Sequence, residues 1–382
     1  MNLMYNSRYP SIDDLRKRAK SKIPGFAFEY LDGGCNEDVN LHRNTRELRE
    51  VQLLPHYLRN SSAVDLRTEI FGHTYDAPFG VSPIGLQGLI WPNAPEILAT
   101  AALQHNIPFI LSTVSTSSIE RISELTEGRA WYQLYHPAEN TLRDDIINRL
   151  QASNYKVLVL LCDVPSFGFR PRDIRNGLAM PPRMTLKNIF QICSRPEWAM
   201  KTLQHGSPTF ATLKPYLPKG LNMNQLGAFM NKTFDGKLNE SKIAAIRDKW
   251  SGKLVLKGVA SLHDAEIALR LGLDGIIVSN HGGRQLDAGE SSIHSLIPII
   301  EQYKNKIKIM MDSGLRSGPD VARSLAIGAD FTFLGRSFMY SVAALGKEGG
   351  NHIMSMLKIQ LRQVMEQVGC SKVDDLRNYL VK

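Results

Sequence analysis

The stretch KLVLKGVASLHDAEIALRLGLDGIIVSN, residues 253–280, contains the unit from which the fold is built. Two apolar runs, KLVLKG (253–258) and GIIVSN (275–280), enclose a helix-like segment at 262–271. Strands that are apolar along almost their whole length are typical of a parallel sheet that is covered on both faces. This stretch therefore predicts a strand, a helix and a second strand parallel to the first.

The same unit recurs on both sides of this stretch. Further apolar runs, separated by helix-like segments, are PFGVSPIG (78–85), PFILST (108–113), AWYQLY (130–135), VLVLLCD (157–163), KIMMDS (308–313) and FTFLG (331–335). Eight such strands predict an α/β fold of the closed (β/α)8 TIM-barrel type. An open doubly wound sheet is the alternative, but no GxGxxG motif follows the first strand.

We expect a single domain in the 382 residues. Residues 1–75 are predicted to form a helical N-terminal extension, residues 76–182 and 238–382 the barrel, and residues 183–237 a long insertion after the fourth strand. The longest uncharged stretch, 77–95, contains four prolines, which argues against a membrane-spanning helix. No apolar signal segment is visible near residue 1, and the four cysteines lie far apart. A cytoplasmic location without a metal site is therefore expected.

The basic charge is concentrated in the insertion. The chain has a formal net charge of +9, and residues 183–232 contain seven basic residues against one acidic residue. The same residues include bulky apolar side chains, which are Phe190, Trp198, Phe210, Tyr216, Leu217, Phe229 and Met230. This combination favours contact with an anionic membrane surface, and a solvated insertion that folds against the barrel is the alternative. No nucleic-acid-binding motif accompanies the charge, so no nucleic acid is expected.

Polar residues stand where the predicted strands end. These residues are Ser112, Gln133, Tyr135, Asp163, Lys257, His281, Asp312, Ser313 and Arg336, together with Pro83 and Gly85 after the first strand. Active sites of this fold lie at the carboxyl ends of the strands. The sequence therefore predicts an active site at this rim, with acid, base and cationic groups.

Two loops predict a phosphate site, and a third predicts a base. The loops DSGLRSGPD (312–320) and LGRSF (334–338) follow the last two strands, where this fold often binds phosphate. Their glycines, Gly314 and Gly335, permit close approach, and Arg316 and Arg336 supply charge. In the loop after GIIVSN, His281 is followed three positions later by Arg284, which carries a guanidinium group. A base beside a carboxylate-binding group suits proton removal from an acid substrate.

The segment SNHGGRQLD (279–287) resembles the signature of the FMN-dependent L-2-hydroxy-acid dehydrogenase and oxidase family. The resemblance extends over nearly the whole chain and is strongest to the bacterial respiratory L-lactate dehydrogenase branch. Further motifs that carry it are PGFAFEYLDGG (24–34), SPIGLQGLIWP (82–92), LSTVSTSSIE (111–120), WYQLY (131–135), CDVPSFGFRPRD (162–173), LVLKGV (254–259) and DSGLRSG (312–318). The resemblance implies FMN as cofactor, an L-2-hydroxy acid as substrate, and a homo-oligomer, by analogy a tetramer.

The resemblance also implies roles for individual residues. His281 would be the base and Asp163 would stabilise its protonated form. Arg284 and Arg170 would bind the substrate carboxylate, with Tyr30 over it and Tyr135 near the hydroxyl group. FMN would be held by Pro83, Gly85, Ser112, Gln133, Lys257, Ser279, Asp312, Ser313, Gly314, Arg316, Gly335 and Arg336. A lysine buried on a strand would also need an anionic partner, which we expect to be the reduced flavin.

Several alternatives stay open at this stage. The acceptor is expected to be a quinone, reached from the inner face of the cell membrane, while an oxidase would instead pass electrons to O₂. Gly85 stands at a position where several oxidases of the family that this chain resembles have alanine, and this difference favours the dehydrogenase. Val114 stands where plant glycolate oxidase has a tryptophan, which leaves room for lactate, a longer hydroxy acid or mandelate. A non-catalytic flavin-binding protein is a remote alternative, and the residues do not separate carbanion from hydride transfer.

Overall fold

The computed structural model describes residues 5–58, 63–178, 183–206, 208–217, 233–234 and 237–381. Eight parallel strands form one sheet in the order β3-β10-β9-β8-β7-β6-β5-β4. A parallel bridge between Val81 and Phe109 joins the two ends of this order, so the sheet closes into the predicted (β/α)8 barrel. The strands are β3 (Phe79–Val81), β4 (Ile110–Ser112), β5 (Trp131–Leu134), β6 (Val157–Leu161), β7 (Lys253–Val259), β8 (Gly275–Val278), β9 (Lys308–Met311) and β10 (Phe331–Leu334).

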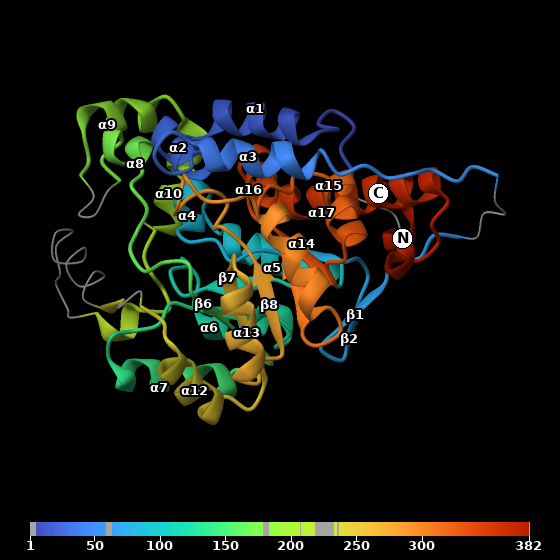
Figure 1. The fold of residues 1–382 in the computed structure, drawn as a ribbon. Helices are drawn as coiled ribbons and strands as arrows, with labels where there is room; N and C mark the ends of the chain where they lie inside the picture. The colour runs from blue at the N-terminus through green and yellow to red at the C-terminus, as the bar shows by residue number, and fades with distance from the viewer. Residues whose placement is uncertain are drawn as a thin grey trace.

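Amphipathic helices surround the barrel (Figure 1). They are α4 (Gln87–Ile90), α5 (Ala94–Gln104), α6 (Ile119–Thr126), α7 (Asn140–Ala152), α8 (Pro171–Arg175), α12 (Glu240–Lys249), α13 (Leu262–Arg270), α14 (Ser292–Tyr303), α15 (Gly318–Ile327), α16 (Arg336–Leu345) and α17 (Gly349–Val368). N-cap serines determine where several of these helices begin. The hydroxyl groups of Ser118, Ser261 and Ser291 accept hydrogen bonds from backbone N–H groups in the first turns of α6, α13 and α14. Short 3-10 helices at Gly346–Glu348 and Val373–Tyr379 flank α17.

The N-terminal extension contains the expected helices, α1 (Ile12–Lys22), α2 (Gly25–Asp32) and α3 (Val39–Leu48). In Figure 1 these helices lie together along the top of the molecule. Helix α1 packs on α16, and α3 packs on α14 and α15, so the extension lies against the barrel. The prediction of an all-helical extension was incomplete, because β1 (Thr68–Ile70) and β2 (His73–Tyr75) form an antiparallel hairpin.

This hairpin belongs to the interior of the barrel. Ile70 and Tyr75 are buried in one apolar cluster with residues that the strands direct inward, among them Val159, Ile277 and Phe331. The indole Nε1 of Trp131 donates to the Tyr75 hydroxyl at 3.2 Å. The hairpin therefore covers apolar side chains of the barrel interior and excludes water from them.

The described part of the insertion is not a bare loop. It contains α9 (Leu186–Cys193), α10 (Pro196–His205) and a 3-10 helix at Lys214–Tyr216. Two of the side chains predicted to reach a membrane are buried instead: Trp198 is 4% exposed and Phe210 is 6% exposed. Trp198 packs edge-on to Phe26 of α2 and donates to the carbonyl of Ile90 at 3.1 Å. Lys219, Phe229, Met230 and Lys232 lie outside the described residues.

Candidate active site

A cavity of about 530 Å³ lies at the carboxyl ends of the barrel strands. Its lining includes every predicted site residue except Asp163 and Ser279, which lie behind His281 and Lys257. The predicted residues that line it are Tyr30, Pro83, Gly85, Ser112, Gln133, Tyr135, Arg170, Lys257, His281, Arg284, Asp312, Ser313, Gly314, Arg316, Gly335 and Arg336. The structure therefore brings the predicted residues to one place, although they come from all parts of the chain.

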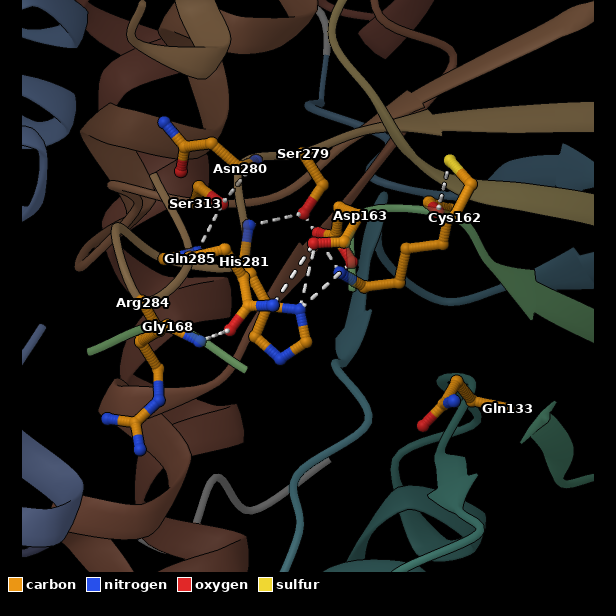
Figure 2. A network of polar contacts seen from close by, with 12 residues as sticks. Gln133, Cys162, Asp163, Gly168, Ser279, Asn280, His281, Arg284, Gln285 and Ser313 are labelled. Atoms are coloured by element: carbon orange, nitrogen blue, oxygen red, sulfur yellow. Dashed lines mark hydrogen bonds and ion pairs between the residues drawn. The ribbon is translucent and has the colours of Figure 1, made fainter. Parts of the chain in front are cut away.

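His281 and Asp163 face each other at one side of this cavity (Figure 2). Nδ1 of His281 lies 3.1 Å from Oδ1 and 3.2 Å from Oδ2 of Asp163. His281 lies in the loop after β8 and Asp163 in the loop after β6, so the carboxyl ends of these two strands bring the pair together. The contact occupies Nδ1 and leaves Nε2 as the nitrogen that accepts a proton.

Burial decides the protonation of His281. It lowers the pKa of the imidazole below its ordinary value of 6.5, and the Asp163 carboxylate opposes this shift without cancelling it. The sequence-based expectation that the carboxylate would raise the basicity was right in direction, but burial is the larger effect. Because the pKa is lowered, the imidazole is neutral at pH 7 and is able to accept a proton.

Arg284 and Arg170 lie together beside the base. Nη1 of Arg284 donates to the carbonyls of Tyr30 at 2.9 Å and Gly33 at 2.7 Å, and its guanidinium lies 5.1 Å from the centre of the Tyr30 ring. Nη2 of Arg170 donates to Gln285 at 3.0 Å. Burial, reinforced by the neighbouring Arg170, lowers the pKa of Arg284 to about 10, so it remains charged at pH 7. Two adjacent guanidinium groups in a buried place suit a carboxylate ligand.

Two residues near this pair were missed by the sequence reasoning. Asp173 lies 3.9 Å from Arg170 and 4.0 Å from Arg284, and burial raises the pKa of its carboxyl group. Gln285 donates to the carbonyls of Asp163 at 3.1 Å and Ser166 at 3.2 Å, and it thereby joins two strand-end loops. Both stand within the quoted motifs, but neither position alone indicates which loop it contacts.

Lys257 has an anionic partner within the protein. Its Nζ lies 2.9 Å from Oδ2 of Asp312 and donates to the Ser279 hydroxyl at 2.8 Å. Burial alone would lower the pKa of Lys257, but the Asp312 carboxylate holds this pKa above its ordinary value. In the same way the Lys257 ammonium group holds the pKa of Asp312 below its ordinary value, although burial opposes this shift. The expectation that this buried lysine needs an anionic partner is therefore met, but by Asp312 within the protein and not by the reduced flavin that was expected to supply the charge.

Arg316 and Arg336 have no carboxylate within ion-pair distance in the described chain. Arg336 donates instead to the carbonyls of Leu31 at 3.0 Å, Gly282 at 2.9 Å and Gly33 at 2.8 Å. Burial, with repulsion from Arg316, lowers the pKa of Arg336 to about 9, and burial also lowers the pKa of Arg316. An anion between two such groups would relieve their repulsion, so the loops after β9 and β10 fit a phosphate.

The opposite wall contains an unpaired amide. Ser112 donates to Oε1 of Gln133 at 2.9 Å, but Nε2 of Gln133 is buried without a hydrogen-bond partner. Buried amide donors are rarely left unpaired, because doing so costs about 1–3 kcal/mol. An acceptor on a bound flavin ring would satisfy this donor, and with the cationic groups described above the cavity fits FMN.

The described chain contains neither a metal site nor a spanning helix. Within the described ranges, no three His, Cys, Asp or Glu residues are grouped so that they could bind a metal ion. Across these same ranges, no helix is both long and apolar enough to cross a bilayer.

Comparisons with known proteins agree with this geometry. A model of the FMN-dependent dehydrogenase family matches residues 19–382. The L-lactate dehydrogenase of Vibrio parahaemolyticus is 37% identical over 371 residues, which are 97% of this chain and 98% of that protein. The L-lactate dehydrogenase of Pectobacterium atrosepticum is 35% identical over 364 residues, with 95% and 94% of the two chains covered.

Two solved structures are similar over almost their whole length. The crystal structure of the monotopic membrane protein (S)-mandelate dehydrogenase has a TM-score of 0.92 and 31% identity, and all of both chains is covered. A structure of mandelate oxidase has a TM-score of 0.84 and 30% identity over 98% of each chain. The chain belongs to the FMN-dependent dehydrogenase family and is an FMN-dependent L-2-hydroxy-acid dehydrogenase.

Proposed function

We propose that this enzyme oxidises L-lactate to the corresponding 2-oxo acid and passes the electrons to a membrane quinone. The observation that carries the proposal is the placement of His281, paired with Asp163, beside Arg284 on one cavity. This cavity provides a neutral base and a carboxylate-binding group for the same small molecule. The names of the relatives favour L-lactate as that molecule.

Arg284 binds the substrate carboxylate in this proposal. Its Nη1 is already held by two backbone carbonyls, so Nε and Nη2 are the donors for a two-point contact with a carboxylate. Arg170 contributes a second positive charge, and Tyr30 covers the bound group. Burial raises the pKa of Tyr135, so its phenol stays protonated and donates a hydrogen bond to the substrate oxygen.

His281 accepts one proton from the substrate at Nε2. Asp163 holds Nδ1 and stabilises the imidazolium that forms. Two routes agree with these roles, one that removes the proton from Cα and one that removes it from the hydroxyl group.

FMN, when bound, accepts the two electrons that leave the substrate. In this proposal Arg316, Arg336, Gly314 and Gly335 bind its phosphate, and Lys257 lies near the part of the ring that becomes negative. The ring would also be held by Ser112, Gln133, Pro83 and Gly85, while Ser279, Asp312 and Ser313 hold Lys257 and the loop in place.

A mandelate-type substrate is the second candidate. The cavity lining includes apolar side chains at Val114, Ile174, Leu178 and Phe210, which would pack against a ring. The similar solved structures carry mandelate in their titles. Anaerobic reduction of the bound flavin is measured with L-lactate, glycolate, L-2-hydroxybutyrate and (S)-mandelate. We expect L-lactate to give the highest ratio of the flavin-reduction rate constant to the substrate Kd. A higher value for mandelate would reverse the assignment.

The quinone and the oxidase alternatives differ in how the reduced enzyme meets O₂. Mixing anaerobically reduced enzyme with O₂ or with a soluble quinone measures both reoxidation rates. We expect fast reoxidation by the quinone and slow reoxidation by O₂. Rapid reoxidation by O₂ with release of hydrogen peroxide would establish the oxidase instead.

Peripheral binding to an anionic membrane, on the inner face of the cell membrane, completes the proposal. Apolar side chains on and beside α9 and α10 are exposed, namely Met184, Leu186, Ile189, Phe190, Met200 and Leu203. Lys187 and Lys201 are exposed on the same two helices. Apolar and basic groups together favour an anionic bilayer surface. A lid over the cavity or a contact between subunits is the alternative role for these helices.

Substitution of the exposed apolar groups tests this surface. The variant Leu186→Gln/Phe190→Gln should sediment less with phosphatidylglycerol vesicles than the wild type and keep its lactate activity. The matched control Tyr57→Gln/Leu58→Gln removes apolar groups that are 72% and 102% exposed elsewhere. Equal sedimentation of all three proteins would refute the proposed surface.

Light scattering of the wild type tests the homotetramer, for which the family resemblance is the support.

A further inference from the structure

The catalytic histidine stands in an unusual backbone turn. His281, Gly282 and Gly283 have φ angles of 59°, 66° and 72°, all in the left-handed region. Glycine adopts this region freely, but a residue with a Cβ atom does so only at a cost in free energy. Surrounding groups must therefore hold the turn, and with it the direction of the imidazole.

Side chains, not strand pairing, bind the N–H groups of this turn. The hydroxyl of Ser279 accepts from the N–H of His281 at 3.1 Å, and that of Ser313 accepts from Gly282 at 2.9 Å. The N–H of Gly283 is shared between two oxygens of Asn280, the side-chain Oδ1 at 3.2 Å and the backbone carbonyl at 3.1 Å. These contacts are drawn in part in Figure 2. The position of the Asn280 amide is thus one of the conditions for the turn.

Two buried asparagines of α3 hold the Asn280 amide in turn. Asn44 and Asn280 exchange two hydrogen bonds: Nδ2 of Asn280 donates to Oδ1 of Asn44 at 2.7 Å, and Nδ2 of Asn44 donates to Oδ1 of Asn280 at 2.8 Å. Nδ2 of Asn280 also donates to Oδ1 of Asn40 at 2.9 Å. Asn40 and Asn44 are 0% and 1% exposed. This reciprocal pairing allows a single orientation of the Asn280 amide.

The backbone of the N-terminal extension also meets the turn directly. The N–H of Cys35 donates to the carbonyl of Gly283 at 3.0 Å. A Cβ atom on Gly283 would lie 2.5 Å from the backbone nitrogen of Leu41, so α3 and the turn are in close contact. Neither Asn40, Asn44 nor Asn280 lines the cavity, so these residues affect the reaction only indirectly. Helix α3 also contacts the loop of Gly314, and the effect of Asn44 on the His281 turn must therefore be separated from an effect on that loop.

We propose that Asn44, assisted by Asn40, is a positioning residue for the reaction, which fixes the direction of His281 through Asn280. The inference rests on the proposed role of His281 as the base. Loss of the Asn44 amide removes the side-chain donor to Oδ1 of Asn280 and one of three acceptors of its Nδ2; the other two acceptors, Oδ1 of Asn40 and the carbonyl of Glu290, remain. The Asn280 amide is then held less firmly, and the imidazole of His281 samples directions other than that toward Asp163 and the substrate. Small displacements of a reacting group are costly in rate, while Arg284 and Arg170 still bind the substrate.

The test measures flavin reduction in single turnovers, per bound FMN and without oxygen, with the 2-hydroxy acid that reduces the wild type. For Asn44→Ala we expect a reduction rate constant roughly ten- to hundredfold below the wild type, with the substrate Kd changed less than about threefold. Asn44→Asp is nearly isosteric and keeps the oxygen that accepts from Nδ2 of Asn280 at 2.7 Å and from the N–H of Ser292 at 3.1 Å, but it loses the donor to Oδ1 of Asn280. It should show the same split between rate constant and Kd if Asn44→Ala does not fold. Thr126→Val is the control, because it removes a buried hydroxyl that donates to the carbonyl of Ile122 at 2.7 Å and accepts from the N–H of Ala130 at 3.3 Å; its flavin should be reduced at the wild-type rate.

A double-mutant cycle separates positioning from general support of the fold. In a His281→Gln background, Asn44→Ala should slow flavin reduction by less than about twofold, because its effect acts through His281. Wild-type reduction rates in both Asn44 variants, or an equally large effect with and without His281, would overturn the proposal. If no 2-hydroxy acid reduces wild-type flavin, the proposed function itself fails, whereas normal rates in the Asn44 variants remove only this inference.

Discussion

Nζ of Lys257 lies 2.9 Å from Oδ2 of Asp312, and both side chains are more than nine-tenths buried. The pair sits between β7 and the end of β9, on the wall of the cavity that fits FMN. Because each charge is taken out of water, each depends on the other for stabilisation. Asp312 thus keeps Lys257 charged beside the proposed cofactor site, and no bound anion is needed for this.

Lys257→Met should lower the free energy of unfolding by about 3–5 kcal/mol, because it leaves the Asp312 carboxylate buried and unpaired. The additional change Asp312→Leu should recover part of this loss. Urea unfolding of the flavin-loaded proteins, followed by tryptophan fluorescence, measures both changes.

The matched control is Lys253→Met on the same strand, where the lysine pairs with Asp274 at 2.8 Å but its side chain is 47% exposed. Its effect should stay below about 1 kcal/mol. Equal losses at positions 253 and 257 would show that burial of the Lys257 pair has no energetic consequence.

Gln133→Met should weaken FMN binding about fivefold, because the hydrogen bond proposed for the free Nε2 is worth about 1 kcal/mol. In the protein without FMN the change removes only the hydrogen bond from Ser112 to Oε1, because Nε2 has no protein partner, so the free energy of unfolding should fall by about 1 kcal/mol. Fluorescence titration with FMN gives the Kd. Unchanged affinity in the variant would remove Gln133 from the cofactor site.

The pH dependence of the reaction follows from the burial of His281. Burial lowers the pKa of this imidazole below 6.5, and the base acts only when it is unprotonated. Lactate kcat/KM should therefore still exceed half of its maximum at pH 6.5 and reach its midpoint only at lower pH. A profile already half-lost above pH 7, and absent from His281→Gln, would contradict this assignment.

The same lowered pKa has a consequence for stability. Below pH 6.5 an unfolded chain binds a proton at His281 that the folded chain binds less readily, so this group makes unfolding easier as the pH falls. His281→Gln should flatten the fall in melting temperature between pH 6.5 and pH 5. An identical pH dependence in the two proteins would show that His281 is not held neutral by the fold.

Much of the fold was predictable because strand and helix patterns alternate regularly from residue 78 onward. The barrel then places the ends of its strands together, which is why His281, Asp163 and Arg284 could be assigned to one site before any coordinates. The hairpin before the barrel was missed for a local reason. Its turn, Phe71 and Gly72 with φ angles of 55° and 82°, has a phenylalanine where Asn or Asp would signal a two-residue hairpin turn.

Contacts between distant segments could not be read from the sequence. Asp312 is as plausible a ligand for a flavin as for Lys257 until the distance between them is known. The burial of Trp198 against Phe26 depends on how α10 docks on α2, and composition alone does not give that orientation. The asparagines of α3 carry no motif, and they matter only because α3 packs beside the turn of His281.

The most direct test of the account compares flavin reduction by L-lactate in the wild type and in His281→Gln, in stopped flow without oxygen. Both proteins should bind FMN with the same stoichiometry, because His281 makes no contact on which the phosphate loops depend. The wild-type flavin should bleach in a single rapid phase, and the variant should bleach about 10²- to 10⁴-fold more slowly, the usual contribution of a positioned base. Bleaching of the variant at the wild-type rate would contradict the central claim that His281, held by Asp163, removes the proton.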